Sequence, residues 1–453
     1  MEKSSLRRVV LTGAIWTTLS FGFAQVVRLG SNVVLTRLLD PEMFGVMALT
    51  SVVIAGVTMF ADVGVYPSIV RSKRGEDPTF LQTAWTVQCL RGIAIWAVAV
   101  AAAVPMARYY AAPSLAYLIP VVGLSAILQG LRSTNHALLD RLMMARRREI
   151  ISVVAQLSGA IVMVVWALLA PSVWALVSGG LMLALIETIW GHRLRLGPGP
   201  RFRLDRESLQ ELFGFGKWIT LSTAITFFGN QADRLVLGKL ISLHELGVLG
   251  IAFSLIDAPS ALILRLSRSV LFPVMSRMTE MPREEFRATV LKARRTPMMI
   301  VGVGLAVACA FGDLAVNLIY DERYVYAGWT FVMLAVTLWF KASVSMLEPM
   351  LLAIGKTFYG MAANTARLPT NFVLIPVMFA WLGMPGAVLA MVLRDVVYYA
   401  VMNVGLARER LRVMRQDAWL FLFFVAVTAF FVLVRYALGF GTSLDLMTMR
   451  LPD

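Results

Sequence analysis

Stretches of about 20 apolar residues, each long enough to cross a bilayer as a helix, recur throughout this 453-residue chain. Apolar residues make up 58% of the sequence and charged residues only 15%, a balance that a water-soluble chain of this length could not sustain. The apolar residues are consecutive and do not alternate with polar ones, which excludes a membrane β-barrel. The sequence therefore predicts an all-α polytopic membrane protein.

Hydropathy divides the chain into two series of spans. The first series comprises residues 9–36, 44–69, 83–107, 115–135, 149–169 and 172–190, and the second comprises residues 218–238, 246–274, 297–319, 326–352, 357–381, 384–406 and 418–439. We expect two six-helix bundles around a central cavity, plus one or two extra helices at the C-terminus. The expected parts are an N-terminal bundle at residues 1–190, a cytoplasmic linker at 191–217, a C-terminal bundle at 218–406, and an extra helix and tail at 407–453.

The formal net charge of +15 is unevenly distributed between the two sides of the membrane. With the N-terminus in the cytoplasm, the inside segments hold 27 lysines and arginines and the outside segments hold 5. This asymmetry follows the positive-inside rule and predicts a cytoplasmic N-terminus. The basic charge is thereby explained by orientation and by contact with anionic membrane lipids, and we expect no nucleic-acid partner.

Cysteine and histidine give no sign of a disulfide, a metal site or a cofactor. Cys89 and Cys309 both fall inside expected spans, and the three histidines are scattered without the spacing of metal ligands. We therefore expect neither a metal nor a cofactor.

A short internal repeat supports the division into two halves. Residues 35–47 (LTRLLDPEMFGVM) match residues 237–249 (LGKLISLHELGVL) at two leucines, a glycine and a valine. Both segments join the first two expected helices of their half. Because six helices is an even number, the halves would share one orientation, as in transporters with parallel repeats and a substrate site at the repeat interface.

Ten basic and seven acidic residues lie inside the expected spans. The basic ones are Arg28, Arg91, Arg132, Arg234, Arg265, Arg268, Lys341, Arg367, Arg394 and Arg435, and the acidic ones are Asp62, Glu187, Asp233, Asp257, Asp313, Glu348 and Asp395. An arginine at the bilayer centre costs roughly 2.5–3.5 kcal/mol on insertion scales, so such residues usually face a bundle interior or a wet cavity.

Helical phase places many of these residues on shared polar faces. The faces comprise Gln25, Arg28 and Asn32; Thr223, Thr226, Asn230 and Arg234; Ser254, Asp257, Arg265 and Arg268; Thr337, Lys341, Ser345 and Glu348; and Asn364, Arg367 and Asn371. We infer a hydrated cavity with excess positive charge. Such a cavity suits an anionic cargo, because arginine binds phosphate oxygens bidentately.

Structural roles are the alternative for several of these residues. Arg132, Arg268 and Arg435 lie near span ends, from which their side chains could extend to the interface. Asp257 with Arg265, and Asp395 with Arg367, could form structural ion pairs. Asp62 precedes a glycine, so a role at a helix break competes with ion coupling.

Three segments resemble the oligosaccharide or O-antigen flippase family of the MOP transporter superfamily. They are RLLDPEMFGVMALTSVVIAGVTMFADVGVYPSIVRSK (37–73), FLQTAWTVQCLRG (80–92) and FFGNQADRLVLGKLISLHELGVLGIAFSL (227–255). This family includes lipopolysaccharide biosynthesis proteins, and the resemblance to it covers residues 9–415. It implies alternating access between inward-open and outward-open states, without ATP. It also implies a cargo of polyprenyl-diphosphate-linked oligosaccharide, made on the inner face of the bacterial cytoplasmic membrane. Polysaccharide polymerase and chain-length machinery are further expected partners.

The expected site follows from combining this resemblance with the polar faces. Substrate-binding candidates are Arg28, Asn32, Arg91, Asn230, Arg234, Arg265, Lys341 and Arg367, and candidates for ion coupling are Asp62, Asp233 and Asp257. In this hypothesis the diphosphate first meets Arg91, Arg265 or Lys341, and then passes to Arg28, Arg234 and Arg367.

Three other functions are alternatives for such a sequence. A multidrug antiporter of the same superfamily would need more acidic and aromatic residues around an organic cation. A membrane enzyme, such as a polymerase or glycosyltransferase, would need a larger outside loop than any expected here. A structural scaffold would leave the charges inside the spans unexplained. The sequence therefore favours a flippase that has no enzymatic activity.

Overall fold

The computed structural model describes residues 3–61, 64–267 and 271–441, and all side chains within them except those of residues 3–15, 214–222, 266 and 273. Every regular element in these ranges is a helix, which confirms the all-α prediction. The chain forms two compact units, Met1–Phe227 and Phe228–Asp453, called unit 1 and unit 2 below. Their boundary falls within one helix.

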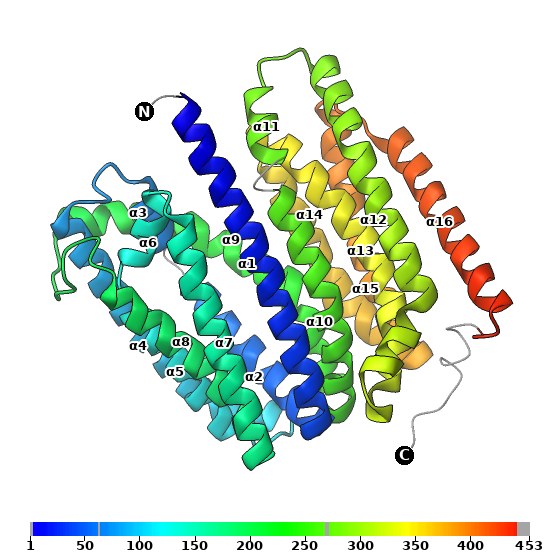
Figure 1. The fold of residues 1–453 in the computed structure, drawn as a ribbon, viewed down its shortest axis with the longest axis horizontal. Helices are drawn as coiled ribbons and strands as arrows, with labels where there is room; N and C mark the ends of the chain where they lie inside the picture. Colours follow the sequence, from blue (N-terminus) through cyan, green and yellow to red (C-terminus); the bar gives the residue numbers. More distant parts are fainter. Residues whose placement is uncertain (1–2, 62–63, 268–270, 442–453) are drawn as a thin grey trace. The chain divides into compact units, whose positions relative to one another are not determined.

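Unit 1 is built from eight helices and the first part of a ninth. Their bounds are α1 Lys3–Leu38, α2 Pro41–Phe60, α3 Val65–Arg71, α4 Pro78–Tyr109, α5 Leu115–Leu131, α6 Asn135–Arg141, α7 Ala145–Leu169, α8 Trp174–Arg193 and the start of α9 Arg206–Leu240. Helix α4 packs along α5, and α7 packs along both α8 and α1. The short helices α3 and α6 lie together at one end of the unit (Figure 1).

Unit 2 begins within α9 and continues to the last described helix. Its other elements are α10 Leu243–Leu266, α11 Phe272–Arg277, α12 Arg283–Ile319, a 3₁₀ turn Glu322–Tyr324, α13 Val325–Ala353, α14 Phe358–Pro369, a π-helical turn (η3) Thr370–Leu374, α15 Ile375–Arg408 and α16 Met414–Ala437. Helix α12 packs against both α13 and α16, and α13 also packs against α10 and α15. Figure 1 shows α16 running alongside α12.

Among the described residues, nine helical stretches are long and apolar enough to cross a membrane, or ten if the bent pair α5–α6 forms one span. The stretch Phe358–Arg408 has 51 residues, far more than the roughly 20 that one crossing needs. It is interrupted at Gly383, whose φ of 65° and ψ of −146° are not helical, so it provides two of the expected spans. The remaining expected spans, residues 9–36 and 218–238, coincide with α1 and α9, which carry more polar residues.

The expected span at residues 44–69 is not a single helix. Residues 44–69 contain α2 and α3, which are separated, and Gly64 before α3 has a left-handed φ of 69° that favours glycine. The prediction of one continuous span over residues 44–69 was wrong, because the apolar composition continues past the end of α2. The expected span 246–274 contains α10 and the start of α11, and residues 268–270 between them fall outside the described ranges.

The order of helices in unit 1 recurs in unit 2. The series α1 to α4 and the series α9 to α12 both run as a long helix, a membrane-length helix, a helix of at most seven residues and a second long helix. The repeated sequence segments lie at equivalent joints, and Leu35 and Leu237 are both buried there. After the second joint, Ser242 and Glu245 form a capping box that starts α10.

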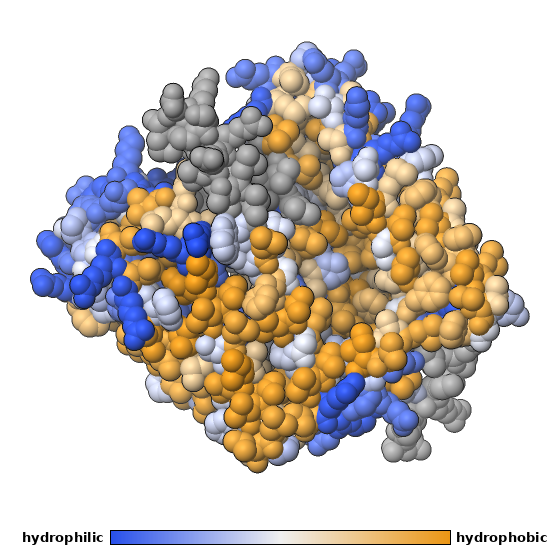
Figure 2. Space-filling view, in the orientation of Figure 1, coloured by the Kyte–Doolittle hydropathy of each residue, from blue (hydrophilic) through white to orange (hydrophobic). Residues whose placement is uncertain are grey.

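The surface of the helices is largely apolar, as expected for contact with lipid. Figure 2 shows apolar residues over the lower end of unit 1, where α7 is followed by α8, and hydrophilic residues gathered along the upper left edge. Exposed side chains at the end of α7 include Ile161, Trp166, Leu168 and Leu169, the last being 81% exposed. In water such a surface would promote association, whereas in a bilayer it contacts acyl chains.

Candidate functional site

A cavity of about 190 Å³ lies within unit 2, lined by charged side chains from five helices. Its lining residues are Asn230, Gln231, Asp233 and Arg234 from α9, Phe253, Ile256 and Asp257 from α10, Leu334, Thr337 and Lys341 from α13, Arg367 from α14, and Arg394 and Asp395 from α15. Seven of these thirteen residues carry a charge. Because charges inside membrane spans are costly, so dense a cluster makes this cavity the candidate functional site.

Arg394 forms the centre of the cluster, between two aspartates. Its guanidinium donates to Asp233 at 2.9 Å and lies 3.3 Å from a carboxylate oxygen of Asp395. All three side chains are at least 92% buried. Two carboxylates thus compensate this arginine, and the group joins α9 to α15. A buried charge of this kind is tolerated only when it is paired and hydrogen-bonded.

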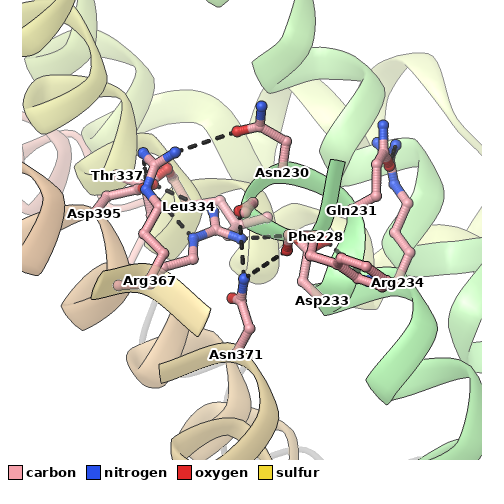
Figure 3. Close-up of polar contacts among 12 residues, drawn as sticks. Phe228, Asn230, Gln231, Asp233, Arg234, Leu334, Thr337, Arg367, Asn371 and Asp395 are labelled. Atoms are coloured by element: carbon pink, nitrogen blue, oxygen red, sulfur yellow. Dashed lines mark hydrogen bonds and ion pairs between the residues drawn. The ribbon is translucent and has the colours of Figure 1, made fainter. Parts of the chain in front are cut away.

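Arg367 connects this charged group to Asn230 of α9. It donates to Asp395 at 2.8 Å and to the side-chain oxygen of Asn230 at 3.2 Å (Figure 3). Its guanidinium also lies 3.8 Å from the centre of the Tyr398 ring. The aromatic face adds a cation–π attraction to the ion pair. Arg367 is therefore held from α9 and α15 at once.

Asn371 fixes the backbone of α9 beside the cluster. Its amide nitrogen donates to the carbonyl oxygens of Phe228 and Gly229, at 3.2 and 3.3 Å. The residue lies in the π-helical turn after α14 and is fully buried. Such turns occur frequently at functional sites. Asn371 thus positions the segment of α9 that carries Asn230 and Asp233.

Arg234 lies at a more exposed part of the cavity. It bonds Asp257 at 3.1 Å and the side-chain oxygen of Gln231 at 2.8 Å, and its guanidinium lies 5.1 Å from the centre of the Phe253 ring. Asp257 is about half exposed. The pairing differs from the expected one, since Asp257 is bonded to Arg234, whereas Arg265 was the anticipated partner.

Lys341 differs from the three arginines of the cavity. It lies near the middle of α13 and lines the cavity. Within the part of the chain that the structure describes, its amine makes no hydrogen bond or ion pair. The described lining therefore holds four cations and three carboxylates, with a single excess positive charge. The predicted excess of positive charge is present here, but it is small.

Unit 1 contains a separate cavity of about 160 Å³ near the bend between α5 and α6. Arg91 and Arg132 both line it, together with Gln88 and Gln129. Arg91 donates to the carbonyl oxygen of Thr58 at 3.3 Å, in the last turn of α2. Its position there also suits a structural role, because cations stabilise helix C-termini.

Arg28 lies on α1, in the same unit but outside this cavity. Its Nε and one terminal nitrogen are buried and have no hydrogen-bond partner in the described structure. Buried guanidinium nitrogens without partners are costly and suit an additional ligand or water. Asn32 is one helical turn away on α1, where the expected polar face places it.

The predicted site residues are thus distributed over several places. Asn230, Arg234, Lys341, Arg367, Asp233 and Asp257 line one cavity; Arg91 lines another; Arg28 and Asn32 lie on α1; and Arg265 lies on α10 outside the described lining. Asp62 and Arg268 fall outside the described residues.

Two residues of the cluster were not among the predicted site residues. Arg394 and Asp395 are consecutive, so a search for polar residues on one helical face does not group them. Their signal in the sequence was the presence of adjacent opposite charges inside an apolar span.

The ion pairs of the structure also decide several of the structural roles expected for charged residues inside the spans. The ion pair between Asp395 and Arg367 is confirmed. Arg435 does not extend to the interface; it is buried and makes two bonds to Asp313, at 2.6 and 2.8 Å. Arg132 bonds Glu187 at 2.8 Å. Among the described residues, no group of three or more histidine, cysteine or acidic side chains is arranged to hold a metal ion.

Comparisons with solved structures identify the fold. The structure of the lipid II flippase MurJ in an inward closed conformation superposes with a TM-score of 0.70, at 12% identity, over 96% of this chain and 100% of that one. An inward-facing multidrug resistance MATE transporter of the MOP superfamily gives a TM-score of 0.67, at 16% identity, over 89% of this chain and 96% of that one. At these identities the likeness is one of fold.

Comparisons of sequence identify relatives. The succinoglycan biosynthesis transport protein ExoT of Rhizobium meliloti (strain 1021) is 24% identical over 71% of this chain and 65% of its own length. The lipopolysaccharide biosynthesis protein WzxC of Escherichia coli (strain K12) is 22% identical over 71% of this chain and 65% of its own length. This chain thus spans somewhat less than two thirds of each of these two relatives.

A family model gives the most direct assignment. The model described as "Polysaccharide biosynthesis protein" matches residues 34–327, which is more than half of the chain. The match includes the two repeated segments and the part of α9 that lines the cavity of unit 2. The chain belongs to the polysaccharide biosynthesis protein family.

Proposed function

We propose that this protein is a flippase that moves a polyprenyl-diphosphate-linked oligosaccharide from the inner to the outer leaflet of the bacterial cytoplasmic membrane. The observation that carries the proposal is the charged cavity of unit 2, in a chain of this family. A membrane-embedded cavity whose described lining carries an excess positive charge suits the binding of an anionic head group. The protein would act by alternating access and have no enzymatic activity.

The diphosphate is the part of the cargo that these residues suit. Its charged oxygens would be drawn by Lys341 and by the edges of Arg234 and Arg367 that face the cavity. Amide groups such as Asn230 and Gln231 would add hydrogen bonds to a sugar or a phosphate. At about 190 Å³ the cavity suits a head group and not a whole oligosaccharide, so the sugar would extend beyond it.

Unit 1 would contribute polar and cationic residues of its own. Arg28 and Asn32 on α1, and Arg91 on α4, would meet the head group at other stages of transport. The buried nitrogens of Arg28 that lack partners support this role, since a phosphate would satisfy them. The ion coupling expected of Asp62, Asp233 and Asp257, and the role of Arg265, remain part of the proposal.

The proposed flippase function also implies a cellular setting. The N-terminus would lie in the cytoplasm, the cargo would be made on the inner face, and a polysaccharide polymerase with its chain-length machinery would receive it outside. The positive-inside distribution of lysine and arginine supports this orientation. The product would be an O-antigen, an exopolysaccharide or a capsule.

A multidrug antiporter is the second candidate, because three aspartates line the cavity of unit 2 and MATE transporters share the fold. Each aspartate is bonded to an arginine, however, so none offers a free carboxylate to an organic cation. This weighs against the antiporter.

The deciding experiment measures translocation of a fluorescent polyprenyl-diphosphate oligosaccharide in proteoliposomes. The wild type is compared with the double variant Arg28→Ala/Arg234→Ala and with Lys356→Met, which removes an exposed positive charge outside the cavity. We expect transport by the wild type and by Lys356→Met, and a loss of more than about tenfold in the double variant. Export of organic cations without movement of the lipid would overturn the proposal in favour of the antiporter.

A further inference from the structure

The charge balance of the unit 2 cavity depends on Lys341. Arg394 and Arg367 are compensated by Asp233 and Asp395, and Arg234 is compensated by Asp257. Among the described lining residues, only Lys341 has no carboxylate bonded to it. It is therefore the source of the cavity's single excess charge.

Lysine and arginine differ in whether that charge can be switched. A guanidinium keeps its proton at any pH that a protein withstands, whereas an ammonium loses its proton at an accessible pH. Had the uncompensated cation been an arginine, the cavity would hold a permanent positive charge. Because it is a lysine, loss of one proton makes the cavity neutral overall.

We propose that Lys341 is a proton-switched anchor for the phosphate groups of the cargo. With its proton, the cavity carries one net positive charge and binds an anion; without it, the cavity carries none and releases the anion. This inference rests on the proposed function, since it takes a diphosphate as the ligand. It goes further by assigning the electrostatic control of binding to one residue.

The other charged groups around the cavity set the background for this switch. They come from the four helices that line it besides α13: Asp233 and Arg234 from α9, Asp257 from α10, Arg367 from α14, and Arg394 and Asp395 from α15. Each of these aspartates is bonded to an arginine. Among the described charged groups of the lining, Lys341 is thus the one that stands outside these ion pairs.

Binding and protonation would be linked thermodynamically. A diphosphate stabilises the ammonium form of Lys341, so binding to the neutral amine would take up one proton from water. Reciprocally, the affinity for diphosphate would fall as the pH rises past the pKa of Lys341. No other reactant is needed, because only a proton is exchanged.

The test uses farnesyl diphosphate, a short lipid diphosphate, and the full-length protein in detergent. Calorimetry would measure the affinity in a pH series that starts above neutrality, where the charge of the diphosphate itself no longer changes appreciably. Lys341→Arg keeps the positive charge at every pH, and Lys341→Met removes it. Lys356→Met is the matched control, because it removes a lysine that is bonded to Glu409 outside the cavity.

We expect the wild type and Lys356→Met to lose affinity about ten- to hundredfold as the pH rises. Lys341→Arg should bind without this loss, and Lys341→Met should bind weakly throughout. A parallel decline in Lys341→Arg and the wild type would overturn the proposal, because another group would then be titrating. Wild-type affinity in Lys341→Met would overturn it as well.

A second measurement reads the amine directly. An amine-reactive reagent modifies only the neutral form, so its rate at Lys341, followed by mass spectrometry of the peptide, reports loss of the proton. Farnesyl diphosphate should slow this reaction at least about tenfold at intermediate pH, because it holds the proton in place. An unchanged rate would contradict the linkage.

The two proposals fail in different ways. Binding to farnesyl diphosphate that depends on Lys341, without translocation in proteoliposomes, would remove the flippase function and leave the anchor. Translocation by the wild type that persists unchanged in Lys341→Met would leave the flippase and remove the anchor.

Discussion

At the scale of residues, the charges in unit 2 fall into two groups with different consequences for stability. Arg394, Arg367 and the two aspartates between them depend on one another, because each is buried and its charge is compensated only by the others. Lys341 has no such dependence. Removal of one member of a buried pair leaves an uncompensated charge, which typically costs more than the pair contributes.

Asp395→Asn should therefore destabilise the protein by roughly 3–5 kcal/mol, because it takes the shared carboxylate from both Arg367 and Arg394. Lys341→Met should change the stability by less than about 1 kcal/mol, since no bonded partner is left behind. Thermal unfolding in detergent, followed by circular dichroism, would measure both. Equal losses of stability in the two variants would contradict the division of these charges into mutually dependent and independent groups.

The sequence identified part of the lining of the unit 2 cavity where one helix carries a stripe of polar residues. The face of α9 with Asn230 and Arg234, and the faces that carry Lys341 and Arg367, were identified because polar residues inside apolar spans are conspicuous. The ion-pair partners of these residues were harder to predict. Helical phase says which residues share a face, but not which other helix that face meets, and so Asp257 was paired with Arg265 when it bonds Arg234.

At the scale of elements, α16 is joined to the rest of unit 2 by buried ion pairs near both of its ends. Asp417 in its first turn bonds Arg294 of α12 at 2.5 Å, and Arg435 in its last turn bonds Asp313 of the same helix. Hydropathy predicted this helix as an extra span beyond the second bundle. It could not predict the packing, because α12 and α16 are separated by more than ninety residues of chain.

The pair at the second end gives a direct test of this packing. Arg435→Met should leave the buried Asp313 uncompensated and lower the stability by roughly 3–5 kcal/mol. Arg435→Met/Asp313→Leu, which removes both charges, should recover most of that loss. Limited proteolysis would report release of α16 in the single variant. If the double variant were as unstable as the sum of the two single variants, the two side chains would be acting independently.

At the scale of the whole molecule, the repeat, the helix order and the charge distribution together constrain the topology. The sequence was sufficient for the positions of the helices, because long apolar runs and short polar joints are local signals. It was insufficient for the breaks after α2 and within α15, where Gly64 and Gly383 interrupt apolar stretches. Glycine allows such a break but does not require it, so composition alone does not locate it.

The orientation of these helices in the membrane can be tested with two exposed positions on opposite ends of α4. Lys73 precedes this helix and Pro113 follows it. If the N-terminus lies in the cytoplasm, a cysteine at position 73 should be closed to a membrane-impermeant maleimide in intact cells, and a cysteine at position 113 should react. Lys73→Cys and Pro113→Cys would each be placed in a background with Cys89→Ala and Cys309→Ala, two thiols that are buried in the native chain. Permeabilised cells provide the control, since both variants should then be labelled. The reverse pattern would place the basic segments outside, against the positive-inside rule, and would put the cargo's entry on the opposite side from the one proposed.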